Sequence, residues 1–370
     1  MQNNKTVLIA GAGPTGLATA IFLAEAKKSV RIVDKLSEPV GYSKAMALNP
    51  RSLELLESTG VTDTLLAAGR EIRFIKLGSL KKPVADLDLN MLGRRYSHMV
   101  GIPQSETEKI LEEKLNSLGI EVERETLLTG FNQTSKSVEV GLLKAGKKET
   151  FSAGYLVGAD GARSNIRKQL GAQFEGETLK GDWHMADVRF SHDSEFTKTL
   201  SSNGLHVIFL DEGFLFAVSF KAGVYRIASN RSNVFDCLPN QDELEGIEWE
   251  SKFTINHRLT TIYAKNRVAL AGDAAHVHSP IGGRGMNLGI EDAFYLANAI
   301  RDGDLENYNE SRLKAARGVI QLVGLQTNMA LGEKLGFRLL RKYVLPTALS
   351  FRPIHKRIVM RFTGLNNAMD

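Results

Sequence analysis

The first part of the chain alternates between two hydrophobic patterns. Val7 to Ala10 form a short, continuous apolar run, which is typical of a strand buried in a parallel sheet. Apolar residues then recur with helical spacing from Leu17 to Ala24. A second apolar run, with the sequence SVRIVD, ends at Asp34. This order predicts a strand, a helix and a second strand.

Three glycines lie between the first strand and the helix. Gly11, Gly13 and Gly16 satisfy the pattern G-x-G-x-x-G, in which the first permits a tight turn, the second lets a pyrophosphate approach and the third lets helix and strand pack closely. The helix N-terminus favours the anion, and Asp34 can accept hydrogen bonds from ribose hydroxyls. Because an acid at 34 disfavours a ribose 2′-phosphate, we expect FAD or NAD here, not NADP.

Two later segments have the same pattern, in which a buried strand is followed by glycine and aspartate. YLVGADGARSNIRKQLG, Tyr155 to Gly171, runs into Asp160 and then into a basic helix start. RVALAGDAAH gives another buried strand, which ends at Gly272 and Asp273, and a glycine-rich loop and a predicted helix follow it. The small residues of this loop indicate that something lies close to its backbone.

Between residues 181 and 253 the pattern changes to the alternation of an antiparallel sheet, to which residues 74–100 are expected to add strands. Such a sheet, inserted into the nucleotide-binding domain, would cover the ligand and set substrate choice. Most of its large side chains are expected to be core. The candidates for substrate contact are Trp183, His206, Phe209, Phe214, Phe216 and Tyr225.

Composition adds few constraints. The 370 residues are 43% apolar and 24% charged, as in ordinary globular proteins. A single cysteine, Cys237, excludes an intrachain disulfide and favours a reducing compartment. No signal peptide and no apolar run of about 18 residues occurs. These features predict a cytoplasmic protein, and nothing in them indicates a nucleic-acid partner.

The net charge of +5 is concentrated near the end of the chain. Residues 331–361 hold eight lysines or arginines and one acid, Glu333. On a helical wheel Lys334, Arg338, Arg341 and Lys342 share one arc, and Leu335, Leu339, Leu340 and Tyr343 share the opposite arc. Such a helix could lie on an anionic membrane surface or on an acidic partner, or it could present a solvated face while its apolar face packs on the protein. We favour the last interpretation.

Together, the three motifs resemble those of the flavoprotein aromatic hydroxylases of the para-hydroxybenzoate hydroxylase family, the single-component FAD monooxygenases. The resemblance runs from about residue 5 to about residue 310. It implies an α/β fold: a discontinuous Rossmann-like FAD-binding domain, an inserted antiparallel-sheet substrate domain and C-terminal helices. The implied boundaries are 1–73, 101–180 and 256–310 for FAD, 74–100 and 181–255 for substrate, and 311–370 for the helices.

The resemblance also implies roles for single residues. Asp273 is expected to bind the FAD ribityl chain, Gln104 the flavin side of FAD, and Asp160 both FAD and the nicotinamide donor. The loop from Gly282 onward is expected to direct backbone N–H groups at the flavin ring, with the helix starting near Met286 stabilising negative charge on the reduced flavin. The implied cofactor contacts are Gly11, Ala12, Gly13, Pro14, Thr15, Gly16, Asp34, Lys35, Lys44, Gln104, Asp160, Gly272, Asp273, Gly283, Gly285, Met286 and Asn287.

Pro280 and Arg284 are the residues expected to act at the reacting centre. Pro280 matches the proline whose carbonyl faces the substrate side of the flavin. Arg284 departs from the usual glutamine or lysine, and its cation is expected either to stabilise a phenolate or carboxylate or to form a surface ion pair. Lys44 replaces a usual arginine, so FAD is expected to be held less tightly there.

Other features narrow the chemistry. His276 and His278 lie in a loop already explained by flavin packing, so a metal site is not expected. No second G-x-G-x-x-G follows, so NADH or NADPH would bind transiently, with Arg163 and Arg167 either as donor contacts or as ordinary helix charges.

The resemblance implies that NAD(P)H reduces FAD, that O2 adds at flavin C4a and that one oxygen atom passes to an aromatic or phenolic substrate. Two alternatives stay open: an enzyme of this fold acting on quinones or isoprenoids at a membrane surface, and a non-catalytic FAD-binding scaffold. Many members of the family form homodimers, and the basic terminal helix would suit peripheral membrane contact.

Overall fold

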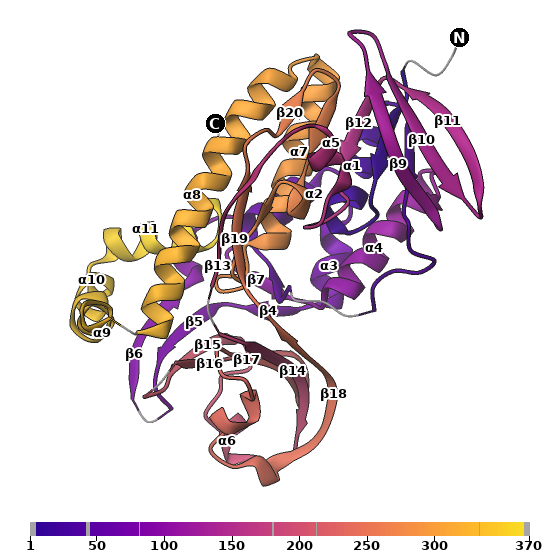
Figure 1. Cartoon of the computed structure of the whole chain (residues 1–370). Helices are drawn as coiled ribbons and strands as arrows, with labels where there is room; N and C mark the ends of the chain where they lie inside the picture. The colour runs from indigo at the N-terminus through magenta and orange to yellow at the C-terminus, as the bar shows by residue number, and fades with distance from the viewer. Residues whose placement is uncertain are drawn as a thin grey trace.

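The strand that follows the N-terminal residues lies near the middle of a six-stranded sheet (Figure 1). The computed structural model describes residues 5–41, 45–80, 82–179, 181–211, 213–332 and 334–365. The sheet has the order β20-β21-β12-β1-β2-β8 and is parallel except for β20. Its strands are β1 (Val7–Ala10), β2 (Val30–Val33), β8 (Val122–Glu123), β12 (Tyr155–Gly158), β20 (Ala264–Lys265) and β21 (Val268–Leu270).

Helices and small sheets surround this parallel sheet. The predicted helix after the first glycine turn is present as α1, and it packs extensively on α7 and α4. The helices of this part are α1 (Pro14–Glu25), α2 (Pro50–Glu57), α3 (Thr62–Ala68), α4 (Gln104–Ser117), α5 (Asn165–Gln169) and α7 (Gly285–Asp302). The additional strands are β3 (Ala47–Leu48), β4 (Arg70–Ile72), β7 (Met99–Gly101), β9 (Thr126–Gln133), β10 (Val138–Lys144), β11 (Lys147–Ala153), β13 (Phe174–Thr178), β19 (Asn256–Thr260) and β22 (His276–Val277).

The second large sheet has seven strands in the order β18-β14-β17-β16-β15-β5-β6 and lies apart from the first (Figure 1). Its strands are β5 (Phe74–Gly78), β6 (Pro83–Asp88), β14 (Trp183–Phe190), β15 (Gly204–Phe209), β16 (Phe214–Lys221), β17 (Val224–Ser229) and β18 (Leu244–Phe253). Short helices lie beside it: η2 (Leu89–Leu92), α6 (Glu195–Lys198), η3 (Val234–Cys237) and η4 (Gln241–Glu243).

The sheet is antiparallel as predicted, except that β5 pairs with β15 in parallel. The reason is that β5 enters from the nucleotide-binding side and is followed by its own hairpin partner, β6. Residues 74–88 join this sheet as predicted, but Met99–Gly101 forms β7, which pairs with β3 and β4 instead.

The predicted C-terminal helices cross between the two parts (Figure 1). They are α8 (Leu305–Leu331), α9 (Leu335–Leu339), the π-helix η6 (Leu340–Val344), α10 (Leu345–Ser350) and α11 (Arg352–Phe362). No helix in the described ranges combines the length and the apolar character that a membrane crossing requires.

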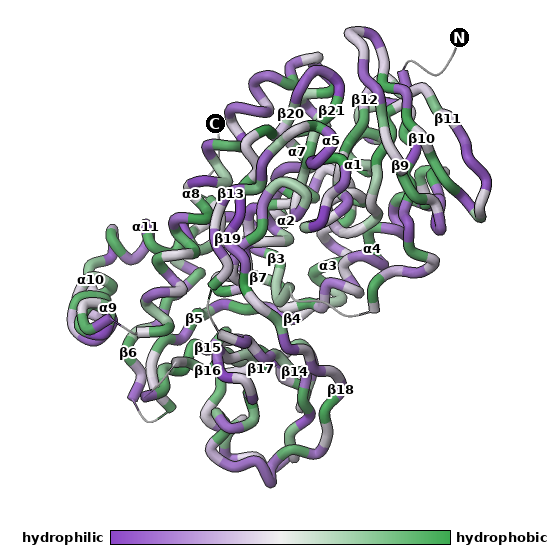
Figure 2. The backbone as a smooth tube through the Cα atoms, in the orientation of Figure 1, coloured by the Kyte–Doolittle hydropathy of each residue, from purple (hydrophilic) through white to green (hydrophobic). Residues whose placement is uncertain are grey.

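The interpretation of residues 334–343 as a helix with a buried apolar arc is wrong. Leu335, Leu339 and Tyr343 are 70%, 47% and 57% exposed, and hydrophobic and hydrophilic residues alternate over this region in Figure 2. Arg338 instead donates to the carbonyl of Gly332, and Arg341 donates to that of Ala330. These two arginines donate to backbone carbonyl groups because α8 ends here and its last carbonyl groups need donors. Contact of the segment with an anionic surface stays a prediction.

Candidate active site

The three glycine-bearing motifs meet at one edge of the parallel sheet. β1, β12 and β21 are neighbours, and their last residues, Ala10, Gly158 and Leu270, are in register. Each motif begins directly after one of these strands, so all three motifs lie at the carboxyl edge, where ligands bind in open α/β sheets. The convergence therefore follows from topology, although the motifs are far apart in sequence.

The glycines of the first motif serve different purposes. Gly11 has φ +106°, and a Cβ there would lie 2.2 Å from the carbonyl oxygen of Ala159. A Cβ on Gly16 would lie 1.9 Å from the carbonyl oxygen of Gly11. A Cβ on Gly13, however, would have no atom within 4 Å. Protein packing requires the outer two glycines, whereas Gly13 borders open space at the start of α1, as a pyrophosphate cradle requires.

The Asp34 carboxylate forms hydrogen bonds with the backbone of this turn. Its Oδ2 accepts from the backbone N–H of Ala12 at 2.6 Å, and its Oδ1 accepts from that of Leu36 at 2.8 Å. The carboxylate thus fixes the glycine turn, and its contact with a ribose stays a prediction. Lys35 is exposed, Pro14 occupies the first turn of α1, and Lys44 lies outside the described residues.

Thr15 joins the first motif to the third. A Cβ on Gly272 would lie 2.4 Å from Thr15 Oγ1, and a Cβ on Gly289 would lie 2.2 Å from the same atom. Both positions must therefore lack side chains for α1 to pack beside the Gly272 turn and α7. This contact connects the two turns that are predicted to hold opposite ends of one FAD molecule.

A cavity of about 430 Å³, which we call the flavin-loop cavity, opens beside the third motif. Asp273 is exposed at its wall, and α7 begins at Gly285, one residue before the predicted position. Gly283 has φ +61°, which only glycine adopts readily. Seven of the predicted site residues line this cavity together: Gln104, Asp273, Pro280, Gly283, Arg284, Gly285 and Met286.

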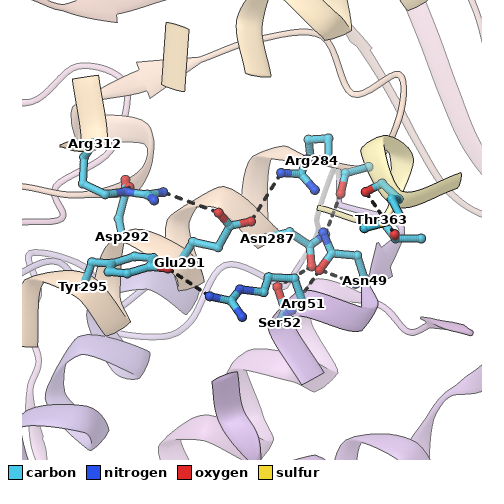
Figure 3. Close-up of polar contacts among 12 residues, drawn as sticks. Asn49, Arg51, Ser52, Arg284, Asn287, Glu291, Asp292, Tyr295, Arg312 and Thr363 are labelled. Atoms are coloured by element: carbon cyan, nitrogen blue, oxygen red, sulfur yellow. Dashed lines mark hydrogen bonds and ion pairs between the residues drawn. The ribbon is translucent and has the colours of Figure 1, made fainter. Parts of the chain in front are cut away.

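The Asn287 side chain is fully buried and forms hydrogen bonds that fix the glycine loop. Its Nδ2 donates to the carbonyls of Gly283, at 2.6 Å, and Ala47, at 2.9 Å. Its Oδ1 accepts from the backbone N–H of Asn49 and from the hydroxyl of Ser52. Only the backbone of Asn287 is therefore available to a flavin, and its carboxamide clamps the glycine loop to the start of α2 (Figure 3).

We expect Asn287→Asp to loosen this loop. In the variant a carboxylate oxygen replaces the amide nitrogen Nδ2, so the carbonyl oxygens of Gly283 and Ala47 lose their donor. Each buried acceptor left unsatisfied costs about 1–3 kcal/mol. The melting temperature should fall, and FAD should dissociate more readily on gel filtration. Asn298→Asp, at a position on α7 outside this cluster, is the control. Equal retention of FAD by both variants would contradict the clamp.

The second motif has a structural role of its own. Asp160 Oδ2 accepts from the backbone N–H of Asn165 at 2.8 Å and so caps α5, while Oδ1 is buried without a partner in the described part of the chain. Arg167 is buried, donates to the carbonyls of Ala162 and Ala274 and lies over Phe174, so the prediction that it contacts a nicotinamide donor is wrong. Arg163 is exposed and lines the flavin-loop cavity.

Gln104 begins α4 at the cavity wall. Its Nε2 donates to Glu108 Oε1 at 2.8 Å. Glu108 is 5% exposed, and burial raises the pKa of its carboxyl group. The glutamine is therefore positioned by a buried acid one turn along the same helix, and its contact with the flavin stays a prediction.

Arg284 lines the flavin-loop cavity but is not a surface residue. It is 1% exposed, and its guanidinium lies 3.3 Å from Glu291 of α7. Burial lowers its pKa, although Glu291 opposes that change. The surface ion pair is thus wrong because the pair is buried, and stabilisation of a substrate anion by Arg284 stays a prediction.

The pair continues into a buried chain of charges (Figure 3). Arg312 of α8 lies 3.7 Å from Glu291 and donates from Nε to Asp292 at 2.7 Å. Asp292 also accepts from His276 and from the backbone N–H of Gly272. Burial alone would raise the pKa of Asp292, but Arg312 and His276 outweigh it and hold the pKa below its usual value. The chain connects the Gly272 turn, α7 and α8.

His278 also lines the flavin-loop cavity, a position that the sequence did not predict. Its Nδ1 lies 2.9 Å from the carbonyl oxygen of Ser279, so Nδ1 carries the proton and Nε2 is left as an acceptor, with no partner among the described residues. Burial lowers its pKa to about 3, so the ring is neutral at physiological pH. Within the described ranges no three metal-ligating side chains converge around it.

Comparison with known proteins agrees with this geometry. Residues 4–323 match the model of a family described as an FAD binding domain. A flavin-dependent monooxygenase of Mycobacteroides abscessus is 32% identical over 88% of this chain and 74% of its own length. Pentachlorophenol 4-monooxygenase of Sphingobium chlorophenolicum is 31% identical over 89% of this chain and 66% of its own length.

The architecture is also that of a solved structure. The p-nitrophenol 4-monooxygenase of Pseudomonas putida superposes with a TM-score of 0.88 at 21% identity, over 98% of this chain and 99% of that one. This likeness establishes the fold, and the sequence matches establish the relationship. The relatives are monooxygenases, which supports the main interpretation over a quinone or isoprenoid enzyme or a non-catalytic scaffold. The chain therefore belongs to the family of FAD-dependent aromatic hydroxylases.

Proposed function

We propose that the protein hydroxylates an aromatic or phenolic small molecule, with NADH or NADPH as electron donor and O2 as the oxygen source. The observation that carries this proposal is the flavin-loop cavity, since residues from α4, the Gly272 turn and the glycine loop line it together. When bound, FAD would supply the redox chemistry and the activation of oxygen.

The residues present suit FAD. The open space at Gly13, at the N-terminus of α1, suits the pyrophosphate, and the carboxylate of Asp34 suits a ribose. Asp273 would hold the ribityl chain, and the backbone at Gly283 and Gly285 would lie against the flavin ring. The start of α7 adds a helix N-terminus, which favours negative charge at that edge.

The protein's own contribution to the reaction would be orientation and exclusion of water. Ile281 and Gly282 lie where the glycine loop faces apolar side chains of the seven-stranded sheet, such as Val207 and Phe216, and Pro280 precedes them at the wall of the flavin-loop cavity. Apolar walls keep water away from a reactive oxygen donor. A cytoplasmic location and a homodimer stay predictions of the sequence.

The test is donor oxidation by the purified, FAD-loaded protein, with NADH and NADPH in turn and with a panel of phenols. We expect one donor to be consumed faster when a suitable phenol is present and a product heavier by one oxygen atom by mass spectrometry. Absence of flavin reduction by either donor would favour a scaffold. Donor consumption that yields only hydrogen peroxide with every compound would contradict aromatic hydroxylation.

A further inference from the structure

A second cavity, which we call the apolar chamber, lies between the seven-stranded sheet and the C-terminal helices. It measures about 200 Å³, and its walls include Leu77 and Val207 from the sheet, Leu322 and Met329 from α8, and Phe362 from α11. Figure 1 shows α8 passing β5 and β6, with α10 and α11 beside them. Only two of its lining residues are polar, Gln326 and Arg361, and Arg361 is exposed.

The chamber and the flavin-loop cavity meet at one loop. Pro280 lines the flavin-loop cavity, and the next residue, Ile281, lines the chamber. A smaller cavity of about 30 Å³ shares Val207, Ile281 and Phe362 with the chamber and reaches Gly282. A molecule in the chamber would therefore lie against the loop whose other side is predicted to contact the flavin.

Gln326 is the one buried polar side chain among the residues that line the chamber. It is 8% exposed, and neither Oε1 nor Nε2 has a hydrogen-bond partner in the described part of the chain. A Cβ on Gly282 would lie 2.6 Å from Oε1, so the carboxamide lies directly against the loop. An unpaired buried amide costs about 1–3 kcal/mol, and such a group in an apolar wall indicates a ligand that completes its hydrogen bonds.

We infer that Gln326 determines specificity by hydrogen bonding to the polar group of an uncharged aromatic substrate whose ring occupies the apolar chamber. This inference rests on the proposed function. The carboxamide oxygen can accept the hydroxyl proton of a neutral phenol, which a methyl ether lacks, and the carboxamide brings no charge for a carboxylate. Arg284, the buried cation of the adjoining loop, is paired with Glu291 and does not line the chamber. The small volume favours one or two rings.

The experiment compares equilibrium binding to the FAD-loaded protein without electron donor, followed by perturbation of the flavin absorbance. The probes are an alkylphenol, its methyl ether and a hydroxybenzoate of similar size. The variant is Gln326→Met, which keeps length but loses both hydrogen-bonding groups. Gln321→Met, at an exposed position on the same helix, is the matched control.

We expect the wild-type protein and the control to bind the phenol about tenfold more tightly than the ether, as one hydrogen bond to a buried amide provides. Gln326→Met should bind the two equally, with affinity for the ether unchanged. Equal weakening of both ligands, tightest binding of the hydroxybenzoate, or no binding of either phenol or ether by the wild-type protein would overturn the inference. Because no donor is present, any of these results leaves the hydroxylation assay as a separate test of the proposed function.

Discussion

We expect Gly13→Ala to leave the polypeptide folded and to weaken its binding of FAD. A Cβ at this position meets no protein atom within 4 Å, and the backbone has φ −76°, which alanine adopts freely. The added methyl group would instead occupy the space into which a pyrophosphate must come to reach the N–H groups of α1. Loss of one or two hydrogen bonds to a charged group weakens binding about tenfold or more. Titration of the apoprotein with FAD, followed by flavin fluorescence, measures the effect.

Gly16→Ala is the control, since it alters the same turn with the opposite outcome. Its Cβ would overlap the backbone carbonyl oxygen of Gly11, at 1.9 Å, and backbone cannot rotate away as a side chain can. We expect the melting temperature of the apoprotein to fall strongly with Gly16→Ala and hardly at all with Gly13→Ala. If Gly13→Ala bound FAD as tightly as the wild-type protein does, the pyrophosphate would not lie beside Gly13.

The sequence alone was sufficient to predict the turns whose conformation depends on neighbouring residues. Gly11 and Gly16 could be recognised because a glycine is needed wherever one backbone touches another, and the spacing identifies the turn. The joint position of Gln104, Asp273 and Gly283 came from the family resemblance, and the structure explains it through the adjacency of β1, β12 and β21. Local patterns therefore gave the turns, and parallel topology brought them together.

The errors arose where a charged side chain has a partner that the local sequence pattern does not identify. The sequence beside Arg284 gives no sign that the side chain is buried and paired with Glu291. In the same way, Arg167 is enclosed by Phe174 and by the carbonyl of Ala274, which belongs to another motif. Helical periodicity also misassigned Arg341, because the carbonyl groups at the end of α8 compete with solvent for its guanidinium. Tertiary contacts decide these orientations, and no local pattern records them.

The buried chain of charges is the clearest instance of such tertiary information. Arg312 lies on α8 and Asp292 on α7, and Asp292 accepts from the backbone N–H of Gly272, which opens the third motif. Arg284 and Glu291 continue the chain beneath the glycine loop. Helix α8 is thereby linked to the shape of the predicted flavin site, although none of its residues lines the flavin-loop cavity.

Arg312→Met tests this connection, and we expect the largest loss of stability of any substitution proposed for this protein. Removing one partner from a buried ionic cluster costs about 3–5 kcal/mol, because the remaining charges stay buried without compensation. Here Asp292 would keep His276 and Glu291 would keep only Arg284. Urea denaturation of the two proteins measures the difference in unfolding free energy. Arg301→Met, which breaks an exposed ion pair with Asp302 near the end of α7, should change it little.

The pH dependence of this loss has a defined sign. In the wild-type protein the pKa of Asp292 lies below its usual value, so its contribution to stability is present above the unfolded pKa and disappears only in strong acid. Without Arg312, burial dominates and should raise the pKa of Asp292. The variant's free energy of unfolding should then be reduced most at pH values where the carboxyl group is ionised in the unfolded chain. Its deficit should therefore be larger at neutral pH than in mild acid. A deficit of equal size at both pH values would mean that Arg312 acts through packing on Tyr295 and not through its charge.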